Sequence, residues 1–429
     1  MIQRLFQFLE ESPVNFLACD AVIRRLSQAG FRPLNPRAPL GNIKPGDKVF
    51  VTKNDSSVYA FHIGNKPLCD AGFRLICAHC DSPTFRLKPD PVLCGGNACA
   101  KLNVETYGGV ILSTWFDRPL SIAGRVILRN HADPFNPISR LVHIKRPILT
   151  IPNLCIHFNR EVNKGVSISV QKEIQPILAI LSEHFSKDDC FKSLLSEMVD
   201  CVEDILDYDL YLYDTTPPCT FGLRNEFISA GRLDDLEMVS CGLEALIAGS
   251  EETPEVTRIL AVFDNEETGS LTKQGAASPF FPSIVERLVM AQGGSRDDYF
   301  RSIENAFMVS ADNAHAYHPN YAEKYDPACY PILGGGPVIK FNAAQKYASD
   351  ARSAAVFQAI CTNAGVPCQR FVNHSDVAGG STLGNILTAN MPIHGVDMGN
   401  AILAMHSVRE TGSIADYLYC IKAFESFYK

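Results

Sequence analysis

The sequence contains no apolar segment that approaches the roughly 20 uninterrupted residues needed to cross a bilayer. It also lacks any long basic run, and its net charge of −8 disfavours nucleic acid as a partner. Residues 1–10 are amphipathic and soon acidic, unlike a secretory signal peptide. We therefore expect a cytoplasmic protein that binds neither membranes nor nucleic acids.

Signatures of several catalytic classes are also missing. There is no G-x-S-x-G motif of a serine hydrolase, and the glycine run 334–336 lacks the spacing of a nucleotide-binding loop. The 15 cysteines are scattered, which suits buried thiols in a reducing compartment better than a disulfide framework. Cys77 and Cys80 form a C-x-x-C pair, but no second Cys or His pair has the spacing of a structural zinc site. A thioredoxin-like redox pair is the alternative for these two cysteines.

With 429 residues, of which 46% are hydrophobic, the chain is long enough for two domains with large cores. Residues 2–11 and 15–29 have the apolar spacing of helices, and 48–63 that of a β-hairpin. Three apolar runs without alternation are typical of buried strands in a parallel sheet: 73–78, 259–263 and 306–311. The sequence thus predicts an α/β fold with a central, mostly parallel sheet flanked by helices.

The pattern changes from about residue 93. Glycine-rich and short alternating runs at 94–96, 107–112, 122–128 and 141–144 indicate strands without intervening helices. Apolar residues between 191 and 206 then recur at helical spacing, and 208–213 has the pattern of a strand. We expect residues 93–215 to form a mainly β domain inserted into an α/β domain of 1–92 and 216–429.

The most informative stretch follows the apolar run 259–263. Two adjacent glutamates, Glu266 and Glu267, stand at the C-terminal end of this strand, where open α/β sheets place ligands. Neighbouring acids repel each other, and a buried pair needs a cation or a shared proton. A dinuclear metal site would explain the pair, with one glutamate as ligand and the other as general base. A solvated acidic loop is the alternative.

Other predicted elements end in metal-ligating residue types. The strand 73–78 runs into His79 and Asp81, and the carboxylate could orient the imidazole of a metal ligand. Asp312 follows the strand 306–311, and His406 lies in the last apolar segment. Asp234 opens a helix, where it could also serve only as an N-cap. Carboxylates with one imidazole per ion suit zinc, with manganese or cobalt as alternatives.

Five motifs together resemble the M18 aminopeptidases, the aspartyl aminopeptidase family of dinuclear metallopeptidases. They are residues 78–83, 232–234, 264–270, 310–315 and 405–410, and the likeness runs in order along the whole chain. The resemblance implies two divalent metal ions, the first held by His79 and Asp312 and the second by Glu267 and His406. It also implies that Asp234 bridges the ions, that Glu266 is the general base and that Asp81 stands behind His79.

The resemblance further implies contacts to substrate and self-association. Lys340 matches a lysine that meets an acidic substrate side chain, and Tyr347 a substrate or oxyanion contact. Residues 93–215 match a dimerisation domain of a family that forms dimers or dodecamers. His157 matches a histidine that reaches a neighbouring active site, although the residues alone suggest a half-buried strand histidine.

The expected activity is hydrolysis of the N-terminal peptide bond of peptides with a free N-terminus, with a preference for Asp or Glu there. Glu266 would take a proton from water and pass it to the leaving amine. Two alternatives remain at this stage. A related deacylase or carboxypeptidase would prefer N-acetylated or C-terminally defined substrates. A catalytically inactive scaffold protein would show no turnover.

Overall fold

The computed structural model describes residues 1–96 and 99–429, which form two compact units. The first unit contains residues 1–81, 218–405 and 410–429, and the second contains 82–217 and 406–409. The predicted inserted segment 93–215 lies within the second unit, which begins earlier, at Ser82. None of the helices in the described ranges is long and apolar enough to cross a membrane.

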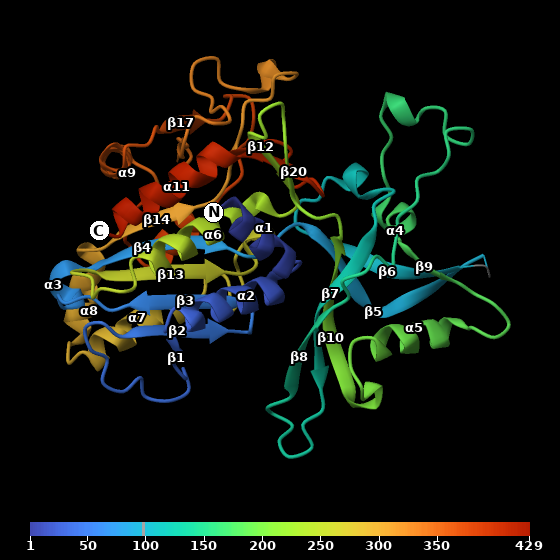
Figure 1. Cartoon of the computed structure of the whole chain (residues 1–429), viewed down its shortest axis with the longest axis horizontal. Helices are drawn as coiled ribbons and strands as arrows, with labels where there is room; N and C mark the ends of the chain where they lie inside the picture. The colour runs from blue at the N-terminus through green and yellow to red at the C-terminus, as the bar shows by residue number, and fades with distance from the viewer. Residues whose placement is uncertain (97–98) are drawn as a thin grey trace. The chain divides into compact units, whose positions relative to one another are not determined.

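A nine-stranded mixed sheet forms the centre of the first unit (Figure 1). Its order is β1 (Arg32–Pro33), β2 (Lys48–Lys53), β3 (Ser57–His62), β13 (Thr257–Phe263), β4 (Phe73–His79), β14 (Phe307–Ala311), β18 (His394–Gly399), β16 (Val338–Phe341) and β17 (Gln369–Val372). The four central strands β13, β4, β14 and β18 are mutually parallel. The predicted strands 73–78, 259–263 and 306–311 are thus confirmed, and so is the hairpin of β2 and β3.

Helices cover both faces of this sheet because its central strands are apolar on both sides. In β4, Ile76 and Ala78 belong to one hydrophobic core, and Leu75 and Cys77 to the other. The first core includes residues of α1 (Ile2–Glu11), α2 (Asn15–Gln28), α6 (Leu233–Ala248), α9 (Ala351–Ala364) and α11 (Ile414–Phe427). The second includes residues of α3 (Leu68–Ala71), α7 (Phe280–Ala291), α8 (Arg296–Glu304) and α10 (Leu383–Asn390).

Two small sheets complete the first unit. One consists of β11 (Cys219–Phe221), β12 (Phe227–Ala230) and β20 (Glu410–Ser413), and the other of β15 (Ala314–His315) and β19 (Ala401–Ile402). The last apolar segment of the sequence analysis, residues 402–410, therefore contributes only its first residue to β19. The glycine run 334–336 lies in a turn, and Asp416 accepts hydrogen bonds from the N–H groups of Gly334 and Gly336, each at 2.7 Å.

The second unit is a six-stranded antiparallel sheet, as its alternating runs predicted. Its order is β8 (Ile138–His143), β7 (Leu120–Leu128), β10 (Ile205–Asp214), β5 (Thr84–Gly95), β6 (Cys99–Tyr107) and β9 (Ile177–Ile180). The expected strand 107–112 is wrong: Tyr107 ends β6, and residues 112–115 form a 3-10 turn. The sheet packs on its own hydrophobic core, to which α5 (Lys187–Ser196) contributes. A short helix, α4 (Val170–Glu173), belongs to the same unit.

The helix expected to run from 191 to 206 is also shorter than predicted. It ends at Ser196, and the chain enters β10 at Ile205, which pairs with Leu128 of β7. Met198, Val199 and Ile205 still pack against the core of this unit, although they lie in a loop and a strand. Apolar residues from three successive elements therefore imitated the period of one helix.

Candidate metal centre

The predicted metal ligands of the first unit stand at the C-terminal ends of its parallel strands. His79 is the last residue of β4, Asp312 directly follows β14, and Glu266 and Glu267 lie in a 3-10 turn after β13. Because β13, β4 and β14 are adjacent and parallel, these ends share one edge of the sheet. Asp234 reaches the same group from the start of α6.

Short distances join these side chains around a buried imidazole. The His79 Nε2 atom lies 3.6 Å from Asp234 Oδ1 and 3.9 Å from Asp312 Oδ2. Ligand atoms of His79, Glu266 and Asp312 all lie within 4.8 Å of one another, as do those of Asp234 and Glu267. The structure therefore brings together the predicted ligands and the predicted base of this unit.

Asp81 holds the ends of two strands together. Its Oδ1 accepts a hydrogen bond from the Glu266 backbone N–H, and its Oδ2 accepts one from that of Glu267, both at 3.1 Å. The Asp81 Oδ1 atom also lies 3.4 Å from His79 Nδ1, and its carbonyl oxygen lies 3.1 Å from the same nitrogen. One buried carboxylate thus fixes the ring of the imidazole and the backbone of both glutamates.

Three further acids support the group, and the sequence did not single them out. Asp235 Oδ2 accepts a hydrogen bond from the His79 backbone N–H at 3.0 Å, and Glu410 Oε2 accepts one from the Asp234 N–H at 3.1 Å. Glu237 accepts hydrogen bonds from the side-chain amides of two asparagines. The only sequence feature that could have indicated these acids is their clustering at the start of α6. Their hydrogen-bond partners lie far away in the sequence, so no local pattern reveals the contacts.

Burial and the many neighbouring carboxylates shift the pKa values of residues in this group. Burial raises the pKa of the Glu266 carboxyl to about 9, and Asp312 and Glu267 act in the same direction, while His79 opposes them. Burial alone would lower the pKa of His79, but the surrounding carboxylates, led by Asp235, raise it well above its ordinary value. This excess of negative charge is what a bound cation would balance.

The donor set fits zinc. One imidazole and several carboxylates within 4.8 Å are the ligand types that zinc accepts, and manganese or cobalt could use the same atoms. Asp235 Oδ1 is buried and, among the described residues, has no hydrogen-bond donor. A buried carboxylate oxygen in that state is costly unless a cation lies nearby.

The two expected substrate contacts of this unit lie beside Asp312. The Lys340 Nζ atom donates to Asp312 Oδ1 at 2.5 Å and to the Asn313 carbonyl at 2.9 Å. It lies 5.5 Å from the centre of the Tyr347 ring, and both residues are buried. With 3% exposure, Lys340 is not a surface lysine whose ammonium group extends into solvent.

His406 and His157 belong to the second unit. The His406 Nδ1 atom lies 3.0 Å from the Gly109 carbonyl oxygen. His157 is exposed in a turn, so the residue-based interpretation of a half-buried strand histidine is wrong. The family-based roles of both histidines stay predictions. In the first unit, His318 and His374 accept hydrogen bonds from backbone N–H groups two residues further on, which gives them a local structural use.

Comparison with known proteins shows which family and which solved structures the chain resembles. A sequence model of the family described as Aminopeptidase I zinc metalloprotease (M18) matches residues 8–428. A Clostridium acetobutylicum protein, Probable M18 family aminopeptidase 2, is 48% identical over 99% of this chain and 98% of its own length. The cryo-EM structure of the Ape4 and Nbr1 complex matches with a TM-score of 0.94 and 34% identity, over 99% of this chain and 85% of that chain. The mApe1 dodecamer of S. cerevisiae matches with a TM-score of 0.85 over 99% of this chain and 95% of that chain, and at 24% identity this likeness shows the fold alone.

Proposed function

This chain belongs to the M18 family of metallo-aminopeptidases, and from that membership we propose that it cleaves peptides by a dinuclear mechanism with a preference for N-terminal Asp or Glu. The observation that carries the proposal is the group of His79, Glu266 and Asp312 at the strand ends, in which the imidazole is buried and both carboxylates are partly buried. His79 and Asp312 would hold one ion, Glu267 and His406 the other, and Asp234 would bridge them. When bound, the ions supply Lewis acidity and lower the pKa of water.

The chain's own residues then perform the proton transfers. Glu266 takes the proton of the attacking water and delivers it to the amine that leaves. Asp81 keeps the Glu266 backbone in place through its hydrogen bond to the N–H group. Burial raises the pKa of Glu266, and the positive charge of bound ions would oppose this effect and keep the carboxylate ionised, so that it can accept the proton.

The acidic preference rests on Lys340. An ammonium group has three N–H donors, and Lys340 uses one on Asp312 and one on the Asn313 carbonyl. The third can meet the carboxylate of an N-terminal Asp or Glu side chain. Tyr347, whose ring lies beside the ammonium, would offer its hydroxyl to the developing oxyanion.

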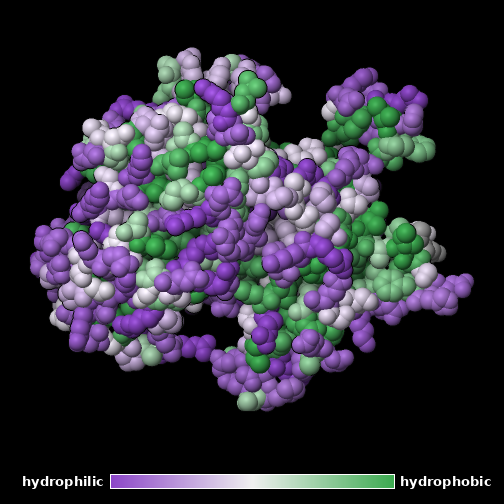
Figure 2. All heavy atoms as spheres, viewed as in Figure 1, coloured by the Kyte–Doolittle hydropathy of each residue, from purple (hydrophilic) through white to green (hydrophobic). Residues whose placement is uncertain are grey.

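We also propose that residues 93–215 mediate self-association into dimers or dodecamers, with His157 completing a neighbouring active site. Apolar atoms are visible on the second unit in Figure 2, and its exposed apolar side chains include Leu154, Phe158 and Ile180. Exposed apolar groups of this kind favour a protein interface. Light scattering of the purified protein measures the assembly directly. A cytoplasmic location is part of the same proposal, and the fifteen free thiols support it.

Hydrolysis of Asp-, Glu-, Leu- and Ala-anilides, before and after chelation and metal add-back, tests the activity. We expect metal-restorable turnover that favours Asp and Glu. Turnover that favours Leu or Ala would retain the mechanism and overturn the acidic preference. Cleavage only of N-acetylated or C-terminally defined substrates would indicate the deacylase or carboxypeptidase. No turnover with metal bound would indicate a catalytically inactive scaffold protein.

The variant Glu266→Gln tests the base. It should bind metal as the parent does and lose about 10²–10⁴-fold in turnover, the usual contribution of general acid–base catalysis. Glu10→Gln, at an exposed position of α1, is the matched control and should behave like the parent. Near-normal turnover of Glu266→Gln would show that another group is the base.

A further inference from the structure

A cavity of about 470 Å³ lies at the opposite end of the central sheet from the metal centre. Three of its residues stand at the N-terminal ends of neighbouring parallel strands: Arg74 in β4, Phe307 in β14 and His394 in β18. Phe307 is in register with both Arg74 and His394, so the three side chains project from the same face of the sheet. From Arg74 to His79, β4 rises about 17 Å, at about 3.3 Å per residue.

The cavity combines an apolar wall with a cationic rim. Val356 and Ile360 of α9 and Phe427 of α11 line it together with Phe307, whose ring lies 6.1 Å from that of Phe427. Arg352, near the start of α9, adds a second guanidinium group. A volume of this size is typical of small-molecule sites, which are mostly apolar with a few polar groups.

Arg74 is the unusual member of this cavity. It is partly buried, and its guanidinium group forms no hydrogen bond or ion pair with the described residues. Burial lowers the pKa of Arg74, and no neighbouring acid offsets this effect. The guanidinium group lines the cavity with its donors unused by the described residues, and an anion could form bidentate hydrogen bonds with it.

The charges near the cavity favour an anion at Arg74. Arg352 and His394 lie on the rim, and His394 also faces Asp350, the N-cap residue of α9. Glu304 is the one carboxylate among the described lining residues, and its side chain is exposed. Its charge is therefore well screened by water.

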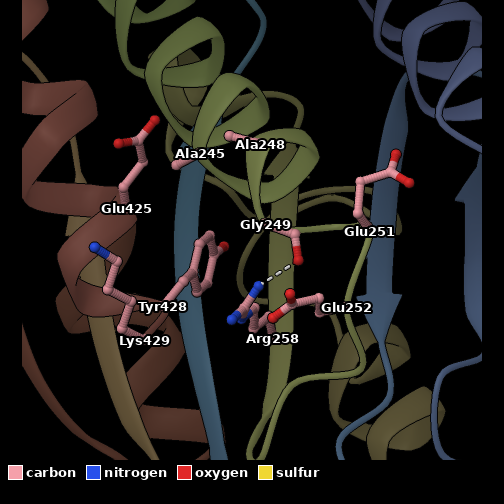
Figure 3. Close-up of a pocket in the computed structure, with 9 residues that line it drawn as sticks. All are labelled: Ala245, Ala248, Gly249, Glu251, Glu252, Arg258, Glu425, Tyr428 and Lys429. Atoms are coloured by element: carbon pink, nitrogen blue, oxygen red, sulfur yellow. Dashed lines mark hydrogen bonds between the residues drawn. The ribbon is translucent and has the colours of Figure 1, made fainter.

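A second pocket at the same end of the sheet has the opposite character. It has a volume of about 410 Å³, and three glutamates line it together with Arg258: Glu251, Glu252 and Glu425 (Figure 3). Arg258 is the register neighbour of Arg74, but its Nη1 donates to the Gly249 carbonyl at 2.6 Å. Because its arginine is bonded and its lining is acidic, this pocket does not favour an anion.

We propose that the cavity beside Arg74 binds a small organic anion, in which a carboxylate or phosphate is attached to an apolar body. The anionic group pairs with Arg74 and Arg352, and the apolar body packs against Phe307 and the side chains of α9. Because the metal centre occupies the other end of β4, the ligand touches none of the metal-binding residues.

Isothermal titration of the full-length, metal-loaded protein tests this proposal. The probes are 3-phenylpropionate for a carboxylate source, adenosine monophosphate for a phosphate source, and neutral 3-phenylpropanamide as the uncharged control. We expect an anionic probe to bind and the amide not to bind. Preference between the two anions identifies the source. If neither anion binds at 10 mM or below, the proposal is wrong.

Arg74→Gln separates this cavity from the metal centre, which could also attract an anion. The variant should weaken binding by about ten- to a hundredfold, the range for hydrogen bonds to charged groups, and leave anilide hydrolysis unchanged. Arg352→Gln, at an exposed position, should also weaken binding and carries the test if Arg74→Gln does not fold. Arg296→Gln, whose exposed guanidinium pairs with Glu286, is the matched control. Unchanged binding by the two cavity variants would overturn the assignment.

Discussion

Replacing Asp81 by asparagine should weaken both the fold and the metal centre. Each of its carboxylate oxygens accepts one backbone hydrogen bond, from Glu266 and from Glu267, and the side chain is only 1% exposed. Asparagine keeps one acceptor and turns the other position into an N–H donor that faces a backbone N–H. The variant therefore loses one charge-assisted hydrogen bond and leaves a buried donor unsatisfied, which together cost about 2–5 kcal/mol of unfolding free energy.

The same change should be measurable in metal affinity. Asp81 orients the His79 ring and the Glu267 backbone, and loss of such a supporting residue typically weakens metal binding about 10–100-fold. Urea unfolding gives the free energy, and competition with a chelating dye gives the zinc affinity. Asp20→Asn is the control, because Asp20 forms an exposed ion pair with Arg24 worth about 0.3–0.5 kcal/mol. If the unfolding free energy of Asp81→Asn is within about 0.5 kcal/mol of that of the parent, and its zinc affinity is unchanged, this reasoning is refuted.

Three further predictions follow from other contacts. Lys340→Met should lower turnover on Asp-anilide about ten- to a hundredfold more than on Leu-anilide; an equal loss on both would mean that Lys340 acts only through Asp312. Burial raises the pKa of Asp416 to about 6 from 3.8. Its contribution to stability is therefore full below pH 3.8 and is lost as pH rises through about 6, by about 3 kcal/mol. Urea unfolding between pH 3.5 and 7 should show this change in the parent relative to Asp416→Asn, and a pH-independent difference would contradict it. Phe281→Ala should cost about 3–5 kcal/mol in urea unfolding, because its buried ring packs on Tyr59 at 5.2 Å and Phe263 at 5.8 Å; a loss below about 1 kcal/mol would mean that the core closes over the gap.

Strands β4, β13 and β14 could be predicted because both of their faces are buried, which requires apolar residues at every position. β18 could not, since its sequence includes His394, Asp397 and two glycines. Asp397 is tolerated in a buried strand because its carboxylate accepts hydrogen bonds from the Thr382 hydroxyl and the Ala348 N–H. Its backbone carbonyl accepts one from the Ser349 hydroxyl. The sequence did not indicate that the second unit begins at Ser82. Pro89, Asp90 and Pro91 break the apolar pattern within β5, so its first half was not recognised as part of that unit.

Some residues of the candidate site could also be predicted from their place relative to the buried strands. His79, Glu266 and Asp312 could be predicted because a polar residue directly after a buried strand is conspicuous. The side chains that support them could not, because a hydrogen-bond partner is set by the tertiary fold. Asn313 and Asn400 approach Glu237 from segments 76 and 163 residues away. Nothing in the local sequence of α6 distinguishes Glu237 from a solvated helix acid.

Supporting contacts of this kind also involve motif residues that lie next to the predicted ligands. In the stretch after β13, Asp264 accepts hydrogen bonds from the Asn15 side chain at 3.0 and 3.1 Å and from the Asn265 N–H at 2.8 Å. After β14, Asn313 bonds to Glu237 and offers its carbonyl to Lys340. Burial raises the pKa of Asp264 and that of Glu237 to about 7, so each depends on its donors to remain ionised near neutral pH. Asn15, Asn265, Asn313 and Asn400 therefore supply donors that favour the ionised form of these two buried acids near the candidate metal centre.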